Sequence, residues 1–248
     1  MQILLDKKAL GLTAIALVAS FAVANNASAS LVFDSSIEIT GTGLGAVNTI
    51  VTAHDPPGDE IESGCVGFDG TSDVVGSSAC LGSLPGGDEL AINQTIAIGD
   101  IAGFTSLGDL ALVFNISETG QDVTVGLNDL FLAVYDEGGT LQYSAFLDGS
   151  LVDSSYTQGT GTGIGGSGFA FRLDAAQAAA ADLVAGVTDD WRIGGGFETT
   201  PETTNDGNET LHVIALEGPV TVPEPATLAI FGVGLAGLGF ASRRRRKA

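Results

Sequence analysis

The chain has 248 residues, with 30 Asp and Glu against 9 Lys and Arg and a formal net charge of −21 at pH 7. Seven of the nine cations lie near the two ends, so the stretch 30–222 has two arginines against 28 acids, a formal charge of −26. A surface of this charge repels phosphate backbones and so excludes nucleic-acid binding. Hydrophobic residues make up 44% of the chain and fall in patterned runs, which excludes disorder as the main state.

The N-terminus has the pattern of an export signal. Two lysines precede a 16-residue apolar run, 9–24, and small residues then form an A-x-A site for signal peptidase. The run is short for a membrane span, and the A-x-A site fits removal better than anchoring. We therefore expect residues 1–29 to form a signal helix that is removed. The residues of the expected cleavage site are Ala27, Ala29 and Ser30.

Short strand-like runs follow, separated by segments rich in Gly, Asp, Ser and Asn. Val123, Val125 and Leu127 alternate with polar or small residues, the period of a strand with one buried face. The Glu-Gly-Gly sequence at 137–139 predicts a hairpin turn. About ten runs with frequent turns predict an all-β domain over 30–221, an antiparallel β-sandwich of jelly-roll type. The expected strands are 31–40, 46–53, 90–98, 110–116, 123–127, 130–135, 141–147, 168–173, 191–197 and 211–216.

Cys65 and Cys80 lie in a Gly/Ser/Asp-rich segment that we expect to be a loop, with 14 residues between them. Outside the cytoplasm, one such pair is most simply a disulfide. A catalytic thiol would need a histidine nearby, and nothing marks His54 or His212 as that partner. A zinc site fits less well, because two Cys and two His have no close ligand spacing.

The acidic residues include oxygen-rich groups that suit Ca²⁺, which accepts six to eight oxygen ligands. The D-x-[DN]-x-[DN]-G calcium loop is absent, however, and a solvated acidic surface accounts for the same residues. We therefore assign no metal site and no cofactor, and keep calcium as the ligand that the acids would suit. The residues concerned are Asp55, Asp59, Glu60, Glu62, Asp69, Asp73 and the segment 205–209.

Sugar binding through aromatic rings is a further interpretation, because β-sandwiches commonly host carbohydrate modules. Twelve of the sixteen aromatic residues are Phe, however, which favours a role in the core. Trp191, beside an arginine in an expected strand, is also expected inside. The other rings concerned are Tyr135, Tyr143 and Tyr156.

One helix is expected within the β-rich region. Asp174 can cap an alanine-rich run, 175–185, and Gly186 can end it. We expect this helix to be a crossover between strands.

Catalytic patterns are weak. The G-x-G-x-x-G match at 161–166 precedes an expected strand rather than a helix, which favours a flexible loop over a dinucleotide site. The chain has no G-x-S-x-G nucleophile elbow. The two histidines leave a Ser-His-Asp triad open without pointing to one, so no catalytic residue is assigned.

The C-terminus has three parts that differ in composition. The segment 222–225, Val-Pro-Glu-Pro, contains two prolines that fix an extended backbone, which suits a protease active site. An uncharged segment, 226–241, follows; as a transmembrane helix at about 1.5 Å per residue it is short for a bilayer. The cationic cluster 243–247 then stays cytoplasmic and places the preceding domain outside. An ordinary membrane anchor is the alternative from composition alone.

This tail resembles the PEP-CTERM sorting signal of Gram-negative bacteria, over 222–248 or about a tenth of the chain. The same tail is sometimes labelled an ice-binding protein C-terminal domain, a label for the anchor rather than for ice binding. The resemblance implies that an exosortase, a polytopic membrane cysteine protease, removes the tail near its Pro-Glu-Pro motif. It assigns recognition to Val222, Pro223, Glu224 and Pro225, and retention to Arg243, Arg244, Arg245 and Arg246.

Together these features predict a signal peptide (1–29), an extracytoplasmic β-domain (30–221) and a sorting segment (222–248). We expect a non-enzymatic protein of the cell surface or of the exopolysaccharide matrix of a biofilm. Its expected partners are signal peptidase and exosortase during processing, the membrane before the tail is removed, and exopolysaccharide. The alternatives are a carbohydrate- or calcium-binding adhesion module and a secreted hydrolase of unrecognised type.

Overall fold

A computed structural model describes residues 30–37, 48–53, 61–76, 81, 92–116, 124–157, 167–201 and 209–216. The predicted signal helix and C-terminal transmembrane helix lie outside these residues. Among the residues described, no helix is both long enough and apolar enough to cross a membrane.

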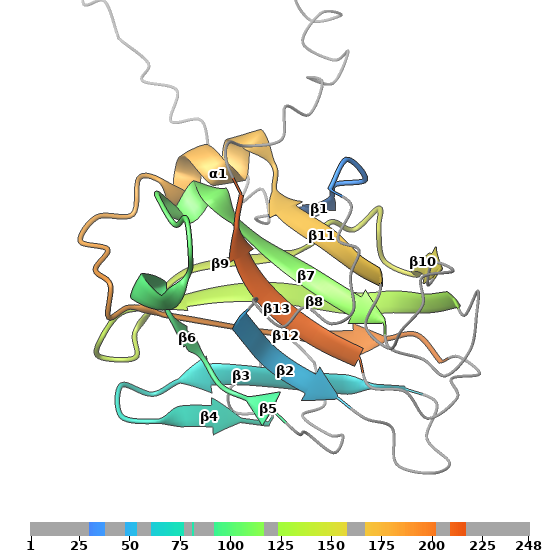
Figure 1. The fold of residues 1–248 in the computed structure, drawn as a ribbon, viewed down its shortest axis with the longest axis horizontal. Helices are drawn as coiled ribbons and strands as arrows, with labels where there is room; N and C mark the ends of the chain where they lie inside the picture. The colour runs from blue at the N-terminus through green and yellow to red at the C-terminus, as the bar shows by residue number, and fades with distance from the viewer. Residues whose placement is uncertain are drawn as a thin grey trace, which may run out of the picture.

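The described residues are mostly β-strand, which confirms the all-β prediction (Figure 1). One α-helix, α1 (Ala175–Ala181), and two 3-10 turns, Ile98–Asp100 and Leu107–Asp109, accompany the strands. The strands are β1 (Ser30–Phe33), β2 (Asn48–Ala53), β3 (Ser63–Phe68), β4 (Asp73–Val75), β5 (Ile92–Asn93), β6 (Ile96–Ala97), β7 (Leu110–Ile116), β8 (Thr124–Tyr135), β9 (Leu141–Leu147), β10 (Ser154–Thr157), β11 (Ser167–Leu173), β12 (Arg192–Thr199) and β13 (Glu209–Ala215).

The strand pairings form one continuous sheet rather than two separate sheets. Its order is β4-β3-β12-β8-β9-β1-β11-β7-β13-β2-β5, with β10 paired to β8 and β6 to β12. The described pairs are antiparallel except β1 and β9, which run parallel. The predicted antiparallel pairing is therefore confirmed in large part, while the division into the two sheets of a jelly-roll sandwich is not shown.

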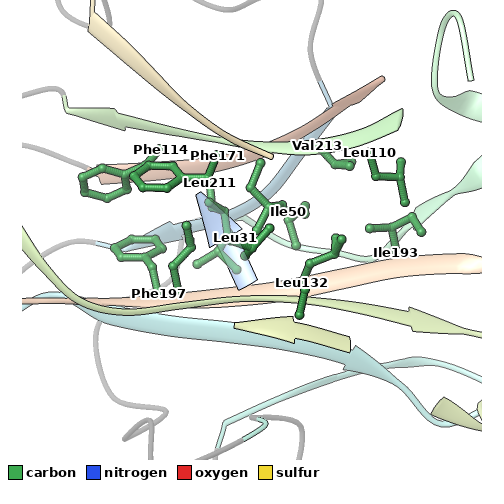
Figure 2. Packing of buried hydrophobic residues seen from close by; sticks show 14 of the residues in the cluster. Leu31, Ile50, Leu110, Phe114, Leu132, Phe171, Ile193, Phe197, Leu211 and Val213 are labelled. Atoms are coloured by element: carbon green, nitrogen blue, oxygen red, sulfur yellow. The ribbon is translucent and has the colours of Figure 1, made fainter. Parts of the chain in front are cut away.

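The sheet turns back on itself and encloses a hydrophobic core. We call β4-β3-β12-β8-β9 the first half of the sheet and β1-β11-β7-β13-β2-β5 the second half. Figure 2 shows Phe114 on β7 and Phe171 on β11 opposite Phe197 on β12, with Leu132 on β8 nearby. The rings of Phe114 and Phe197 meet edge to face, 5.2 Å between centroids, and both side chains are fully buried.

The two ends of the sheet come close to each other. Asp73 opens β4, and its carboxylate accepts a hydrogen bond from the hydroxyl of Thr95, in the link between β5 and β6. Strands β2 and β3, one from each half, are also neighbours. The sheet is thus nearly closed, and most of its apolar side chains point into one enclosed space.

Several strands differ from the predicted ones. The runs at 123–127 and 130–135 belong to one strand, β8. The residues between them do not end the strand, and they produce only an irregularity in its pairing with β12 near Asn128. The run at 90–98 divides into β5, β6 and a 3-10 turn. Strands β3, β4 and β10 were not predicted, since their Gly, Ser and Asp residues resemble those of a loop.

The helix α1 begins as predicted but ends earlier. The carboxylate of Asp174 accepts a hydrogen bond from the backbone N–H of Gln177 at 2.8 Å, which confirms the cap. The predicted end near Gly186 is wrong, because the next N–H groups, of Leu183 and Val184, reach back only three residues and tighten the last turn.

Candidate functional sites

The residues predicted to direct processing lie almost entirely outside the described part of the chain. Ser30 is the exception. It opens β1, and its carbonyl accepts a hydrogen bond from the N–H of Asp174 at 3.2 Å. Leu31, the next residue, is fully buried, so cleavage before Ser30 would leave this first strand whole. The predicted residues outside the description are Ala27, Ala29, Val222, Pro223, Glu224, Pro225, Arg243, Arg244, Arg245 and Arg246.

Cys65 lies in strand β3 and is fully buried, so the expectation that it occupies a loop is wrong. Its predicted partner, Cys80, lies outside the described residues. The following residue, Leu81, packs against the small cluster that contains Cys65. This proximity agrees with a Cys65–Cys80 bond, which stays a prediction. The cluster consists of Cys65, Phe131, Ala133 and Tyr135.

Two of the acids considered for calcium are engaged by the chain itself. Asp69 Oδ1 accepts hydrogen bonds from the N–H groups of Ser72 and Thr71, both at 2.8 Å, and these bonds lower the pKa of Asp69. Asp73 accepts from Thr95, as described above. These two carboxylates therefore support a turn and a sheet contact. Asp55, Asp59, Glu60 and 205–208 lie outside the described residues.

The structure brings together two other acids, 147 positions apart. Glu62 precedes β3 and is 1% exposed, and Glu209 opens β13 and is 0% exposed. Glu62 Oε2 accepts a hydrogen bond from the backbone N–H of Glu209 at 3.4 Å. In the described ranges, no group of three or more His, Cys, Asp or Glu side chains is placed to hold a metal ion, so this site is a pair.

The aromatic rings considered for sugar binding are mostly buried. Trp191, Tyr135 and Tyr156 are 6%, 7% and 5% exposed, and the expectation that Trp191 lies inside is confirmed. Burial raises the pKa of Tyr156 to about 12. Tyr143 is half-buried and donates its hydroxyl to the carbonyl of Gln177 at 3.2 Å. These rings act in packing and do not present open faces to a glycan.

His212 is held in a polar network on β13. Its Nδ1 lies 2.9 Å from Thr49 Oγ1, and its Nε2 lies 2.8 Å from Thr210 Oγ1. The amide of Asn115 donates to Thr210 Oγ1 at 3.2 Å. Burial lowers the pKa of His212 to about 4, so the ring is neutral at pH 7. The hydroxyls of Thr49 and Thr210 therefore hold the two ring nitrogens of His212 in place. His54 lies outside the described residues.

Both arginines of the acidic domain have identified neighbours. Arg172 Nη1 lies 3.2 Å from Asp34 Oδ2 in a largely buried ion pair. Burial alone would raise the pKa of Asp34, but hydrogen bonds from Ser36 and from the arginine hold it below its usual value. The guanidinium of Arg192 lies over the ring of Phe68, 5.3 Å from its centroid. Each arginine therefore serves a local contact.

A second pair of acids lies across strands β8 and β12, where Asp129 is directly opposite Glu198. Burial raises the pKa of Asp129, and the negative charge of Glu198 raises it further. The side-chain amide of Asn128 donates to Glu198 Oε1. This pair is partly exposed, so water can solvate its charges.

Sequence reasoning could not find the Glu62–Glu209 pair. Glu62 was grouped with acids nearby in sequence, and Glu209 with an oxygen-rich segment. The available signal was the alternation along β13, which places Glu209 on the same side as the buried Leu211. That alternation does not say which strand of the other half lies opposite.

The C-terminal segment matches a known sorting motif. Residues 221–246 match the family model of the PEP-CTERM protein-sorting motif, which confirms the resemblance found in the tail. The motif implies that an exosortase processes the chain, and that a membrane-anchored precursor is exported and sorted to the cell surface. The chain matches none of the curated proteins with which it was compared.

Proposed function

We propose that this chain is a non-enzymatic protein of the cell surface or extracellular matrix of a Gram-negative bacterium, associated with exopolysaccharide. The observation that carries the proposal is the sorting motif at 221–246, joined in sequence to an all-β domain. After removal of the tail, the β-domain is the part that acts outside the cell.

The charge of the domain narrows the kind of matrix that it suits. With a formal charge of −26 over 30–222, the domain repels an anionic polymer. A neutral polysaccharide, or an acidic one bridged by divalent cations, is compatible with this surface. Because the aromatic rings considered above are buried or, for Tyr143, half-buried, we expect contacts to a sugar to come mainly from polar groups.

Fractionation of cells tests the sorting step. We expect Pro223→Ala to leave the uncut precursor in the membrane fraction, because the extended Pro-Glu-Pro backbone is the proposed recognition element. Pro219→Ala is the matched control, since this proline lies just outside the matched segment, and it should be processed like the natural chain. Equal release of both variants from the membrane would contradict the proposal.

The non-enzymatic part of the proposal has its own test. The purified protein is incubated with the exopolysaccharide of its host and with the same polymer after partial hydrolysis, and reducing ends are counted. We expect binding without new reducing ends. Specific hydrolysis that disappears when one carboxylate, for example Asp129, is replaced by its amide would instead establish a hydrolase.

A further inference from the structure

The first residue of the expected mature chain, Ser30, has a fixed place in the sheet. Strand β1 runs between β9 and β11, with Ser30 opposite Phe146 of β9. The carbonyl of Ser30 accepts a hydrogen bond from the N–H of Asp174 at 3.2 Å. The carbonyl of Leu31 accepts one from the N–H of Asp148 at 3.0 Å. Neighbours on both sides therefore hold the start of β1, at the residue that we expect to become the N-terminus.

A carboxylate lies beside Ser30. Asp148 directly follows β9, and its carboxylate is hydrogen-bonded to the side chain of Ser30. Hydrogen bonds from the hydroxyl and the N–H of Ser150, together with the one from Ser30, lower the pKa of Asp148, although partial burial opposes this. Asp148 is therefore ionised at pH 7. Because the hydroxyl and the α-nitrogen of a serine are joined through the same Cα, this negative charge also lies close to the nitrogen of Ser30.

Export changes the charge of that nitrogen. In the precursor it belongs to the Ala29–Ser30 peptide bond and is neutral. Hydrolysis by signal peptidase consumes one water: Ala29 leaves with a carboxylate, and Ser30 keeps an amine, which binds a proton below its ordinary pKa of about 8. Cleavage one residue later would put this charge on Leu31, which is fully buried, at a cost in free energy. The structure therefore suits an ammonium group at Ser30.

Other ionisable groups beside β1 have partners of their own. Asp174 caps α1, and Tyr143 donates its hydroxyl to a carbonyl of that helix. Arg172, on β11, is paired with Asp34. The stretch 30–222 contains no lysine. The ammonium group is thus one further cation in a strongly acidic domain, and Asp148 is the acid beside it.

We propose that the ammonium group created at Ser30 by signal peptidase forms an ion pair with the carboxylate of Asp148. The pair joins the start of β1 to the end of β9, so removal of the signal peptide stabilises the strand that it exposes. An ammonium group has several N–H donors, and it can bond to the carboxylate while the carbonyl of Ser30 keeps its contact with Asp174. The inference rests on the expected cleavage before Ser30 and goes beyond the proposed surface function.

Thermal melting of the chain from Ser30 to its C-terminus, prepared by proteolytic removal of a fused leader, tests this contact. Lys247 carries the only other amine of that chain, so in a Lys247→Arg background acetylation modifies Ser30 alone. Acetylation removes the charge and keeps every residue, and it should lower the melting temperature at pH 7 by about 2 to 4 °C. Because Asp148 raises the pKa of the ammonium group, the difference is present below pH 8 and is lost as the pH rises past that pKa.

Asp148→Asn should melt alike with and without the acetyl group, because its amide keeps a hydrogen-bond acceptor but has no charge. Asp190→Asn, at an exposed acid of a turn, is the matched control and should keep the full difference. The contact is disproved if the free and acetylated chains with Asp148 melt alike, a result that requires no variant of Asp148 to fold. A full difference in Asp148→Asn would also overturn it, because the ammonium group would then be bound elsewhere.

The cleavage site is tested separately. Peptide mapping of the exported protein should find Ser30 as its first residue. A different N-terminus would overturn the inference through the cleavage site, and would leave the proposed sorting through the C-terminal motif intact.

Discussion

At the residue scale, one buried histidine makes stability depend on pH. Burial lowers the pKa of His212 to about 4 from 6.5, so the folded state binds fewer protons than the unfolded state between these values. The stability that His212 contributes by staying neutral is therefore fully present above pH 6.5 and is lost as the pH falls toward 4. We expect the free energy of unfolding to fall by about 3 kcal/mol over this window, measured by denaturant titration at several pH values.

His212→Gln isolates this effect, because glutamine can still bond to Thr49 or Thr210 and does not titrate. The variant should lose most of the pH dependence between 6.5 and 4. An unchanged dependence in the variant would show that other groups are responsible.

The burial of the aromatic residues could be predicted from the composition of the chain. A chain whose aromatics are mainly phenylalanine was expected to use them in the core, and Phe114, Phe171 and Phe197 are fully buried there. Composition could not foresee which acids would be buried. Glu62 and Glu209 are buried although they lie 147 positions apart, and the fold brings them together through the hydrogen bond from Glu209 N–H to Glu62 Oε2.

At the scale of elements, the turn between β8 and β9 contacts the turn between β3 and β4. Gly139 has φ +79°, and a Cβ at this position would overlap the backbone of Asp69 and Gly70. Gly139→Ala should therefore lower the free energy of unfolding by about 2 kcal/mol or more, because both the strained φ and the overlap oppose it. Denaturant unfolding measures this loss.

Gly149→Ala is the matched control, since a Cβ there meets no atom within 4 Å. It should change stability by less than about 0.5 kcal/mol. Equal losses in the two variants would contradict the close approach of the two turns.

The segment after β3 is expected to be tied to that strand by the Cys65–Cys80 bond. Reduction should lower the free energy of unfolding by about 3 kcal/mol, the chain-entropy value for a loop of this size. Melting with and without reductant measures this change, and the double variant Cys65→Ala, Cys80→Ala should no longer respond to reductant. Two free thiols found by titration of the unreduced, unfolded protein would refute the bond.

The elements predicted best are those with strong local signals. The Asp174 cap and the hairpin at 137–139 follow from local chemistry, and both are present. Strand β3 was missed because its sequence, SGCVGF, is rich in small residues. Such residues suit β3 because it packs beside Gly194–Gly196 of β12, where a Cβ on any of the three glycines would come too close to neighbouring chain.

At the scale of the whole molecule, the all-β class follows from the pattern of short apolar runs, but the topology does not. Strand β1 pairs in parallel with β9 and antiparallel with β11, partners more than 100 positions away in the sequence. Nothing in the alternation of β1 selects these partners, since any strand with one buried face fits the same pattern. The continuous, nearly closed sheet therefore emerges from long-range pairing.

The measurement that tests the central claim most directly is the mass of the mature protein from its native host, with peptides mapped at both ends. Sorting by an exosortase predicts a chain that begins near Ser30 and ends near 222–225, with any additional mass marking an attached group. A mature chain that still carries Arg243, Arg244, Arg245 and Arg246 would contradict this account and would show an ordinary membrane anchor.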